Sequence, residues 1–256
     1  MPDGFELDHT SVAVADIGST SRWLRRELGA TPIAGEVLDD FRYVLFHVGD
    51  ADGGGRLELM EPESQGGFLD RFVHTHGESP HHLTFTVPNL PDTVSQVRDL
   101  GLSVVGEDYL YDRWREAFVM PESVHRVVIQ LADTTASFPP ATELLSTQER
   151  DVDSFPGNRG AREPRWWEFV WDEEPLRSAT LVSTTLHSRD LAVSRVLFGE
   201  ILHGIATPDG DGVRFSWSHS SIIVRPSTQA GVASIECRGP LPDQAQVGQL
   251  HIEESL

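Results

Sequence analysis

The chain has 256 residues, with 40 acidic side chains against 20 basic ones and a formal net charge of −20. The sequence contains no lysine, so all of these basic residues are arginines. This excludes chemistry that needs a lysine, such as Schiff-base or pyridoxal-phosphate catalysis and the lysine of a P-loop. The negative charge argues against nucleic acid and anionic membrane surfaces as partners, because basic side chains bind both.

Targeting and redox signals are weak. The N-terminal residues MPDGFELDHT have no basic start and no apolar stretch, and no apolar run approaches the roughly 18 residues that span a bilayer. The single cysteine, Cys237, cannot form an internal disulfide, which fits a reducing compartment. We therefore expect a soluble, cytoplasmic protein of one or two domains.

An internal repeat organises the chain. In three segments, an Asp or Asn follows the first residue of a strand-like stretch by seven positions, and a glycine follows further on: His9 to Asp16, His82 to Asn89, and Ser183 to Asp190. The Asp or Asn is a favoured helix N-cap, and the glycine is a favoured residue just past a helix. Each segment therefore predicts a strand followed by a helix of about ten residues.

Strand patterns follow each predicted helix. Strands are expected at 42–48 and 56–61 with a turn at Gly53–Gly55, at 102–105, 117–120 and 126–131, and at 213–217 and 220–225. The unit reads β-α-β-β-β, and its first two copies fill residues 6–133. Further strands are expected at 233–238 and 249–253, which is too little chain for a complete fourth unit.

The segment 134–178 breaks the repeat with several prolines, glycines and tryptophans. We interpret this segment as a connector with a short helix at 141–150. The tryptophans of the connector are expected to pack on a domain face, because Trp side chains are usually buried. The expected division is a two-module domain at 1–133, this connector at 134–178, and a degenerate third module at 179–256.

Two histidines take equivalent positions in the first two modules. Side chains alternate along a strand, so Leu83, Phe85 and Val87 should pack under helices, while His82, Thr84 and Thr86 face the other way. His9 takes the same place in the first strand, with Ser11 beside it. His81 is offset by one residue and should face away.

Two further strands carry one polar residue among apolar ones. Glu58 lies between Leu57 and Leu59, and Gln130 lies between Ile129 and Leu131. An unpaired polar group buried at such a place would be costly. The imidazoles of His9 and His82, the Glu58 carboxylate and the Gln130 amide form a nitrogen and oxygen set suited to one divalent ion: Zn²⁺, Ni²⁺, Co²⁺, Mn²⁺ or Fe²⁺. The alternative is four unrelated, half-buried polar residues.

These motifs resemble the vicinal oxygen chelate superfamily, which includes glyoxalases, epimerases, extradiol dioxygenases and bleomycin-resistance proteins. The resemblance is carried by LDHTSVAV around His9, LELMEP around Glu58, GESPHHLTF around His82 and RVVIQL around Gln130. It covers residues 6–133 well and 179–256 weakly, and methylmalonyl-CoA epimerase and lactoylglutathione lyase are the most similar members. It implies an α+β fold of paired β-α-β-β-β modules forming a cup-shaped mixed or antiparallel sheet around one metal, with a third, degenerate module.

The resemblance also implies the chemistry. The metal would be held by His9, Glu58, His82 and Gln130, and would act as a Lewis acid on two adjacent oxygens of a small substrate, stabilising an enolate as in glyoxalase or epimerase reactions. The last ligand position is usually Glu in these enzymes. Gln130 can ligate but cannot act as a base, so Glu58 becomes the catalytic carboxylate. A second base could be Asp39, Asp40 or Glu116.

Other readings remain open. An Fe²⁺ extradiol-type dioxygenase would need two His and one Glu, although here the Glu comes from a different strand. A binder that sequesters a drug, and a thiol transferase acting on an antibiotic epoxide, are further alternatives. The third module carries Ser183 for His9, Ile222 for Glu58 and about Ala233 for His82, so it lacks ligands and is structural, a lid or a dimer surface.

The substrate is less determined than the metal. Arginines 22, 25, 26, 113 and 115 could meet the phosphates of a CoA thioester, but we favour their being solvated or paired within the chain. His74 and His76, at the end of a predicted helix over 68–76, are expected to be solvated. Small-molecule substrates and pairing of two chains are thus the expected partners.

Overall fold

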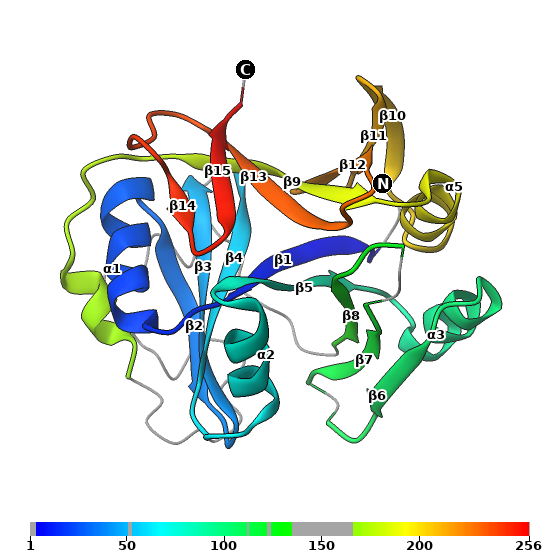
Figure 1. Ribbon diagram of the computed structural model, residues 1–256, viewed down its shortest axis with the longest axis horizontal. Helices are drawn as coiled ribbons and strands as arrows, with labels where there is room; N and C mark the ends of the chain where they lie inside the picture. The colour runs from blue at the N-terminus through cyan, green and yellow to red at the C-terminus, as the bar shows by residue number, and fades with distance from the viewer. Residues whose placement is uncertain (1–3, 51–52, 112, 122–123, 135–165, 256) are drawn as a thin grey trace. The chain divides into compact units, whose positions relative to one another are not determined.

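The computed structural model describes residues 4–50, 53–111, 113–121, 124–134 and 166–255. Their strands form two sheets, one ordered β2-β3-β4-β1-β5-β8-β7-β6 and one ordered β10-β11-β12-β9-β13-β15-β14 (Figure 1). Both sheets are mixed. The first has the parallel pair β5·β8 and the antiparallel pair β7·β8, and the second has the parallel pair β9·β12 and the antiparallel pair β11·β12. The α+β class is confirmed.

The predicted repeat is present three times as strand, helix and three strands. The first copy is β1 (Glu6–Ala13), α1 (Ile17–Leu28), β2 (Thr31–Val37), β3 (Phe41–Asp50) and β4 (Gly53–Pro62). The second is β5 (Ser79–Thr86), α3 (Leu90–Asp99), β6 (Val104–Asp108), β7 (Arg115–Val119) and β8 (Val128–Asp133). The third is β9 (Thr180–Ser188), α5 (Leu191–Ser194) continued by the π-helical η3 (Arg195–Ile201), β10 (Ile205–Asp209), β11 (Gly212–Ser216) and β12 (Ser221–Pro226).

Further elements lie outside the three copies. They are α2 (Phe68–His76), the 3₁₀-helix η2 (Glu168–Asp172), β13 (Gly231–Arg238), β14 (Gln246–Val247) and β15 (Leu250–Glu254). None of the helices in the described ranges is both long enough and apolar enough to cross a membrane. The expected helix at 141–150 lies outside the described residues.

The helix starts follow from the predicted N-caps. The side chains of Asp16, Asn89 and Asp190 each accept a hydrogen bond from a backbone N–H in the first turn of the helix that follows. At the far end of α1, Gly29 has φ 68°, the left-handed conformation expected after a helix. In the third copy His203 adopts this conformation, with φ 55°, where the repeat predicted that Gly204 would adopt it.

Three local expectations were wrong or incomplete. The glycines at 53–55 belong to β4 and not to a turn, and a Cβ on Gly54 (φ 135°) would lie 2.5 Å from the Val48 carbonyl oxygen across the pair. Strands β2 and β10 were not expected. Each contains a proline, and neither shows the alternation of buried and exposed residues on which strand prediction depends.

The described chain divides into two compact units. The first unit comprises Met1–Thr10, His81–Ser137 and Ser183–Ile235, and the second comprises Ser11–Pro80, Phe138–Val182 and Glu236–Leu256. The prediction of a two-module domain, connector and third module is a division along the chain, and it stays a prediction.

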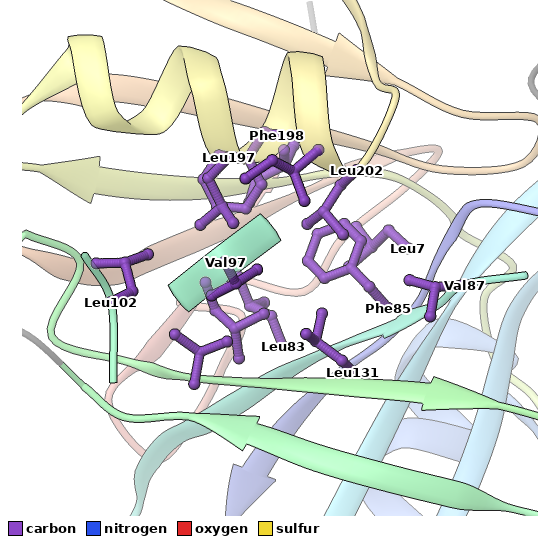
Figure 2. Packing of buried hydrophobic residues seen from close by; sticks show 14 of the residues in the cluster. Leu7, Leu83, Phe85, Val87, Val97, Leu102, Leu131, Leu197, Phe198 and Leu202 are labelled. Carbon is purple, nitrogen blue, oxygen red and sulfur yellow. The ribbon is translucent and has the colours of Figure 1, made fainter. Parts of the chain in front are cut away.

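The core of the first unit lies under its helices. Leu83 and Phe85 of β5, and Val87 directly after this strand, are buried with Val97 of α3 and Phe198 of η3 (Figure 2). The predicted apolar face of β5 is therefore confirmed. The opposite face of this strand is left for the polar side chains described below.

The described end of the connector, 166–178, packs within the second unit. Trp167 is 1% exposed, and a Cβ on Gly35 of β2 would lie 2.5 Å from its ring. The guanidinium carbon of Arg25 lies 5.4 Å from the Trp171 ring centre, and that of Arg22 lies 4.5 Å from the Phe169 ring centre, both within cation–π range. The prediction that these aromatic residues pack on a domain face is confirmed.

Candidate metal centre

His9 and His82 lie together in the first unit. Their ring centres are 5.8 Å apart, in an edge-to-face arrangement, and each residue is 6% exposed. Two buried imidazoles at this separation bring nitrogen donors to one place. This is the juxtaposition that the repeat predicted from their equivalent positions in β1 and β5.

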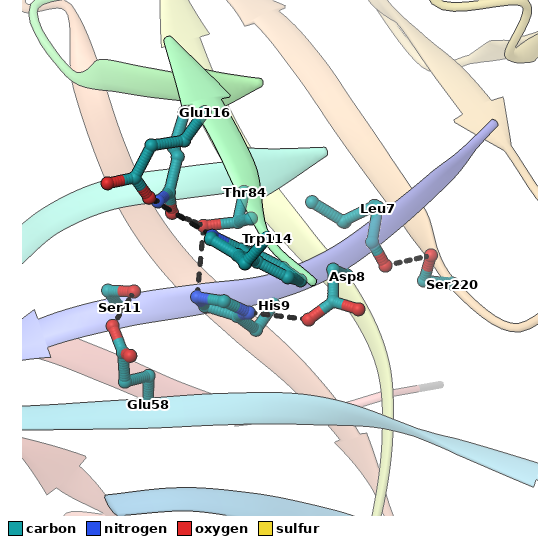
Figure 3. A network of polar contacts seen from close by, with 10 residues as sticks. Leu7, Asp8, His9, Ser11, Glu58, Thr84, Trp114, Glu116 and Ser220 are labelled. Atoms are coloured by element: carbon teal, nitrogen blue, oxygen red, sulfur yellow. Dashed lines mark hydrogen bonds and ion pairs between the residues drawn. The ribbon is translucent and has the colours of Figure 1, made fainter. Parts of the chain in front are cut away.

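Thr84 connects His9 to Gln130. The Thr84 hydroxyl donates to Gln130 Oε1 at 2.7 Å, and its oxygen lies 2.9 Å from His9 Nε2 (Figure 3). The register supports the contact, because Thr84 in β5 pairs with Gln130 in the parallel strand β8. Two of the predicted ligand atoms therefore lie beside the same hydroxyl, whose one proton goes to Gln130 Oε1.

Asp8 orients the His9 ring. Its Oδ1 lies 2.6 Å from His9 Nδ1, and the Asp8 side chain is 13% exposed. A carboxylate can only accept, so Nδ1 is the donor and Nε2 is the nitrogen directed toward Thr84. Such a carboxylate partner is what fixes the tautomer and orientation of metal-binding histidines.

His82 is held in its neutral form. Burial, followed by the nearby charges of His81 and His9, keeps the pKa of His82 well below its usual value of 6.5. Its Nδ1 lies 2.9 Å from Nδ1 of His81. The expectation that His81 faces away was therefore incomplete, because its ring reaches back to His82. A neutral imidazole is the form that binds metals.

Glu58 belongs to the second unit and is held by β1. It is 8% exposed, and its Oε2 accepts a 2.6 Å hydrogen bond from the Ser11 hydroxyl. Ser11 follows His9 by two positions in β1, so both side chains lie on one face of that strand. Among the described residues, His9, Glu58 and His82 are a group that could hold a metal ion.

Glu116 is one of the three suggested second bases, and it lies beside Gln130. Its Oε2 accepts from Gln130 Nε2 at 2.7 Å and from the Trp114 indole nitrogen at 3.0 Å. The other two suggestions, Asp39 and Asp40, are exposed, and Asp40 accepts from the Ser64 hydroxyl at 2.7 Å. Glu116 thus contacts a predicted ligand directly.

The third module shows a shift in the predicted alignment. Thr84 pairs with Gln130 in β5·β8, and the equivalent residue Thr185 pairs with Ile223 in β9·β12. The counterpart of the ligand position is therefore Ile223 and not Ile222, an error of one residue that would turn the side chain to the other face. Both isoleucines are fully buried, and neither offers a ligand atom because the side chain of isoleucine is a hydrocarbon.

Several residues were missed or are not brought together. Asp8 and Trp114 were not predicted, although Asp8 is next to His9, and Thr84 was predicted only to share the strand face of His82. His74 and His76 are exposed at the end of α2, as expected.

Most of the arginines considered for phosphate binding contact the chain itself: Arg22 pairs with Glu173, Arg25 lies over Trp171, Arg26 pairs with Glu27 and Arg115 pairs with Asp133.

The comparisons with known proteins bear on the fold of the first two modules. Residues 8–118 match the family model described as the glyoxalase/bleomycin resistance protein/dioxygenase superfamily. The resemblance to this superfamily is confirmed for that part of the chain, which includes His9, Glu58 and His82. A search of curated proteins gave no match.

Similar solved structures include methylmalonyl-CoA epimerases. A Streptomyces coelicolor methylmalonyl-CoA epimerase variant in complex with 2-nitronate-propionyl-CoA is 24% identical, with a TM-score of 0.47, over 53% of this chain and 98% of that one. The enzyme from Mycobacterium tuberculosis is 25% identical, with a TM-score of 0.45, over 51% of this chain and 88% of that one. A hypothetical protein from Bacillus halodurans C-125 is 22% identical, with a TM-score of 0.47, over 53% of this chain and 98% of that one.

Proposed function

We propose that this chain is a metal-dependent isomerase or lyase of the glyoxalase and epimerase type, which binds one divalent ion through His9, Glu58, His82 and Gln130. The observation that carries the proposal is the meeting of His9 Nε2 and Gln130 Oε1 at the Thr84 hydroxyl, at 2.9 and 2.7 Å. Both atoms are lone-pair donors that Zn²⁺, Ni²⁺, Co²⁺, Mn²⁺ and Fe²⁺ accept.

The chemistry of the donor set fits such an ion. The four predicted ligand residues are all buried polar side chains: His9, Glu58, His82 and Gln130. The Asp8 carboxylate supports the set, because it directs His9 Nε2 toward the other donors. The third module has Ile223 at the position of Gln130, so we assign the ion to the first two modules alone.

The reaction follows from what the donors can do. When bound, a divalent ion supplies Lewis acidity to two adjacent substrate oxygens, which makes a neighbouring C–H acidic. Glu58 is the one carboxylate of the proposed ligand set, and we assign it the removal and return of that proton. Gln130 cannot exchange a proton at neutral pH, so it only orients and ligates.

The arginine contacts favour a substrate of low charge. Arg22, Arg26 and Arg115 are engaged with acidic residues of the same chain. With a net charge of −20 as well, the chain offers few cations for a substrate that carries several phosphates. We therefore propose a small α-hydroxy or α-keto acid, or its thiol adduct, as the substrate class. We also propose that residues 179–256 form a metal-free module that provides a surface for dimerisation.

The proposal is tested by measuring exchange of the substrate's α proton in the wild type and in a variant of Glu58. Candidate α-hydroxy and α-keto compounds are incubated in D₂O with the metal-loaded protein, and exchange of the α proton is followed by NMR. The wild type and the Glu107→Gln control should exchange the proton, because Glu107 is a surface residue paired with Arg98. Glu58→Gln should lose exchange by about 100-fold or more, in line with the loss of a general base.

Three results would contradict the proposal. Full exchange in Glu58→Gln would remove its catalytic role. Oxygen uptake with a catechol, dependent on Fe²⁺ and without proton exchange on any acid, would instead assign the extradiol-type reaction. A ligand that binds tightly to metal-stripped protein, with no turnover, would favour a sequestering protein.

A further inference from the structure

Glu116 contacts Gln130, the one proposed ligand whose side chain ends in both an oxygen and a nitrogen. Its Oε2 accepts hydrogen bonds from Gln130 Nε2 at 2.7 Å and from Trp114 Nε1 at 3.0 Å (Figure 3). All three residues belong to the first unit and lie on or next to the antiparallel pair β7·β8. The contact is therefore between neighbouring strands of one sheet.

The strand register explains how Glu116 reaches Gln130. Phe118 of β7 pairs with Gln130, and Glu116 pairs with Ala132. Paired residues share a face of the sheet, and so do residues two apart along a strand. Glu116 is thus the diagonal neighbour of Gln130 on the same face, within reach of a long side chain.

The two end atoms of a glutamine side chain have opposite hydrogen-bonding properties. The oxygen of Gln130 accepts hydrogen bonds or binds a cation, whereas its nitrogen only donates. A carboxylate only accepts, so Glu116 can be satisfied only by the nitrogen. With Nε2 directed at Glu116, Oε1 is directed at Thr84, from which it accepts at 2.7 Å. Trp114 supports the arrangement, because its indole can only donate and so keeps Glu116 in place as the acceptor.

We propose that Glu116 is a positioning residue of the metal centre, which fixes the amide of Gln130 so that its oxygen, and not its nitrogen, faces the ion. This inference rests on the proposed function, because it needs a metal at Gln130. It gives a physical reason for an amide at the final ligand position, where the resemblance leads one to expect a carboxylate. A second carboxylate there would lie within hydrogen-bond distance of Glu116, and the two charges would repel.

The amide orientation is tested first in protein without metal. In ¹⁵N-labelled wild type, the side-chain amide of Gln130 should show shifted proton resonances and slow hydrogen exchange, because Nε2 is held by a charged acceptor. Glu116→Gln should move these resonances toward those of a free amide. Unchanged resonances in Glu116→Gln would overturn the proposal whether or not the protein binds a metal.

Metal affinity is tested next with Co²⁺, by its visible absorption spectrum. Glu116→Gln should weaken Co²⁺ binding by about 10- to 100-fold, as for the loss of other partners that orient metal ligands. Glu107→Gln is the matched control, an exposed carboxylate on β6 of the same unit, and should bind as the wild type does. Circular dichroism and melting temperature show whether each variant folds.

An exchange of the two residues separates orientation from mere packing. In the double variant Glu116→Gln with Gln130→Glu, the amide at 116 donates to the carboxylate at 130, so one hydrogen bond is kept with its direction reversed. The double variant should recover most of the Co²⁺ affinity that Glu116→Gln loses, and its spectrum should shift because a carboxylate replaces an amide oxygen.

The outcomes distinguish the two proposals. If the wild type binds Co²⁺ and Glu116→Gln binds it within twofold, the positioning role is overturned and the proposed function stands. If the wild type binds neither Co²⁺ nor Zn²⁺, the proposed function fails, and the positioning role fails with it. If the single variant loses affinity and the double variant does not regain it, Glu116 acts through the packing of β7 and not through the amide.

Discussion

His125 should make the stability of this protein depend on pH. It is 3% exposed, its Nε2 lies 2.9 Å from the Ser194 hydroxyl, and its ring centre lies 5.3 Å from that of Phe198. Burial lowers the pKa of His125 from 6.5 to about 4, and the nearby charge of Asp190 opposes this only in part. The folded protein therefore holds the imidazole neutral.

The sign and size of the effect follow from this shift. The pKa of His125 is lower in the folded than in the unfolded chain, so unfolding takes up a proton below pH 6.5. The stabilisation is complete above pH 6.5 and is lost as the pH falls from 6.5 to about 4. A shift of this size corresponds to about 3 kcal/mol in total, at about 1.4 kcal/mol per unit, of which about 2 kcal/mol is already lost at pH 5.

The assay is urea unfolding of the wild type and His125→Gln at pH 7 and pH 5. Between these pH values the wild type should lose about 2 kcal/mol more than the variant, which cannot take up the proton. His74→Gln removes an exposed histidine from α2 and is the control. An equal loss in the wild type and His125→Gln would refute the reasoning that the fold excludes the charged imidazole.

Three substitutions test other parts of the structure. Phe85→Ala empties the centre of the first unit's core and should cost about 3–5 kcal/mol of unfolding free energy, measured by urea titration; a loss under 1 kcal/mol would mean that this core is loosely packed. Asp16→Ala removes the N-cap of α1 and should cost about 1 kcal/mol, seen as a lower melting temperature, while a melting temperature equal to that of the wild type would show that the cap is dispensable. Thr84→Val should cost about 1–3 kcal/mol in metal-free protein, because it strips a hydrogen bond from the buried Gln130 oxygen. Saturating Zn²⁺ should reduce that loss in thermal melts, and a loss unaffected by Zn²⁺ would count against Gln130 as a ligand.

Local signals in the sequence predicted the repeated strand and helix. The N-cap residues Asp16, Asn89 and Asp190 act within a few residues of themselves, so the chain nearby is enough to place each helix start. The end of the third helix depended on tertiary structure. There His203 takes the left-handed conformation, and its ring stacks on Phe5 with ring centres 4.4 Å apart, a contact with the far end of the chain.

Strand β2 could not be recognised for a related reason. All seven of its residues are buried, so no alternation marks it, and Pro32 and Gly35 both argue against a strand. Trp167 covers Gly35, where a Cβ would lie 2.5 Å from the ring. The glycine that weakens the strand in the sequence is thus the place where a segment more than 100 residues later packs.

The ligands were predicted from the alternation of side-chain direction along single strands, which requires no information about the neighbouring strands of the sheet. Partners across strands needed the register as well. Thr84 meets Gln130 because β5 and β8 are paired, and Glu116 meets Gln130 because β7 and β8 are paired. Without that register, the sequence could neither choose Glu116 over Asp39 and Asp40 nor align the third module to better than one residue.

The proposed function depends on one bound metal ion, so the stoichiometry of metal binding tests it. Metal-stripped wild type is titrated with Zn²⁺ and Co²⁺ by calorimetry, and the as-purified protein is analysed for bound elements. We expect one ion per chain, with binding lost in His82→Ala and kept in His74→Ala. Absence of divalent-ion binding in the wild type, or equally tight binding in His82→Ala, would contradict the proposed function.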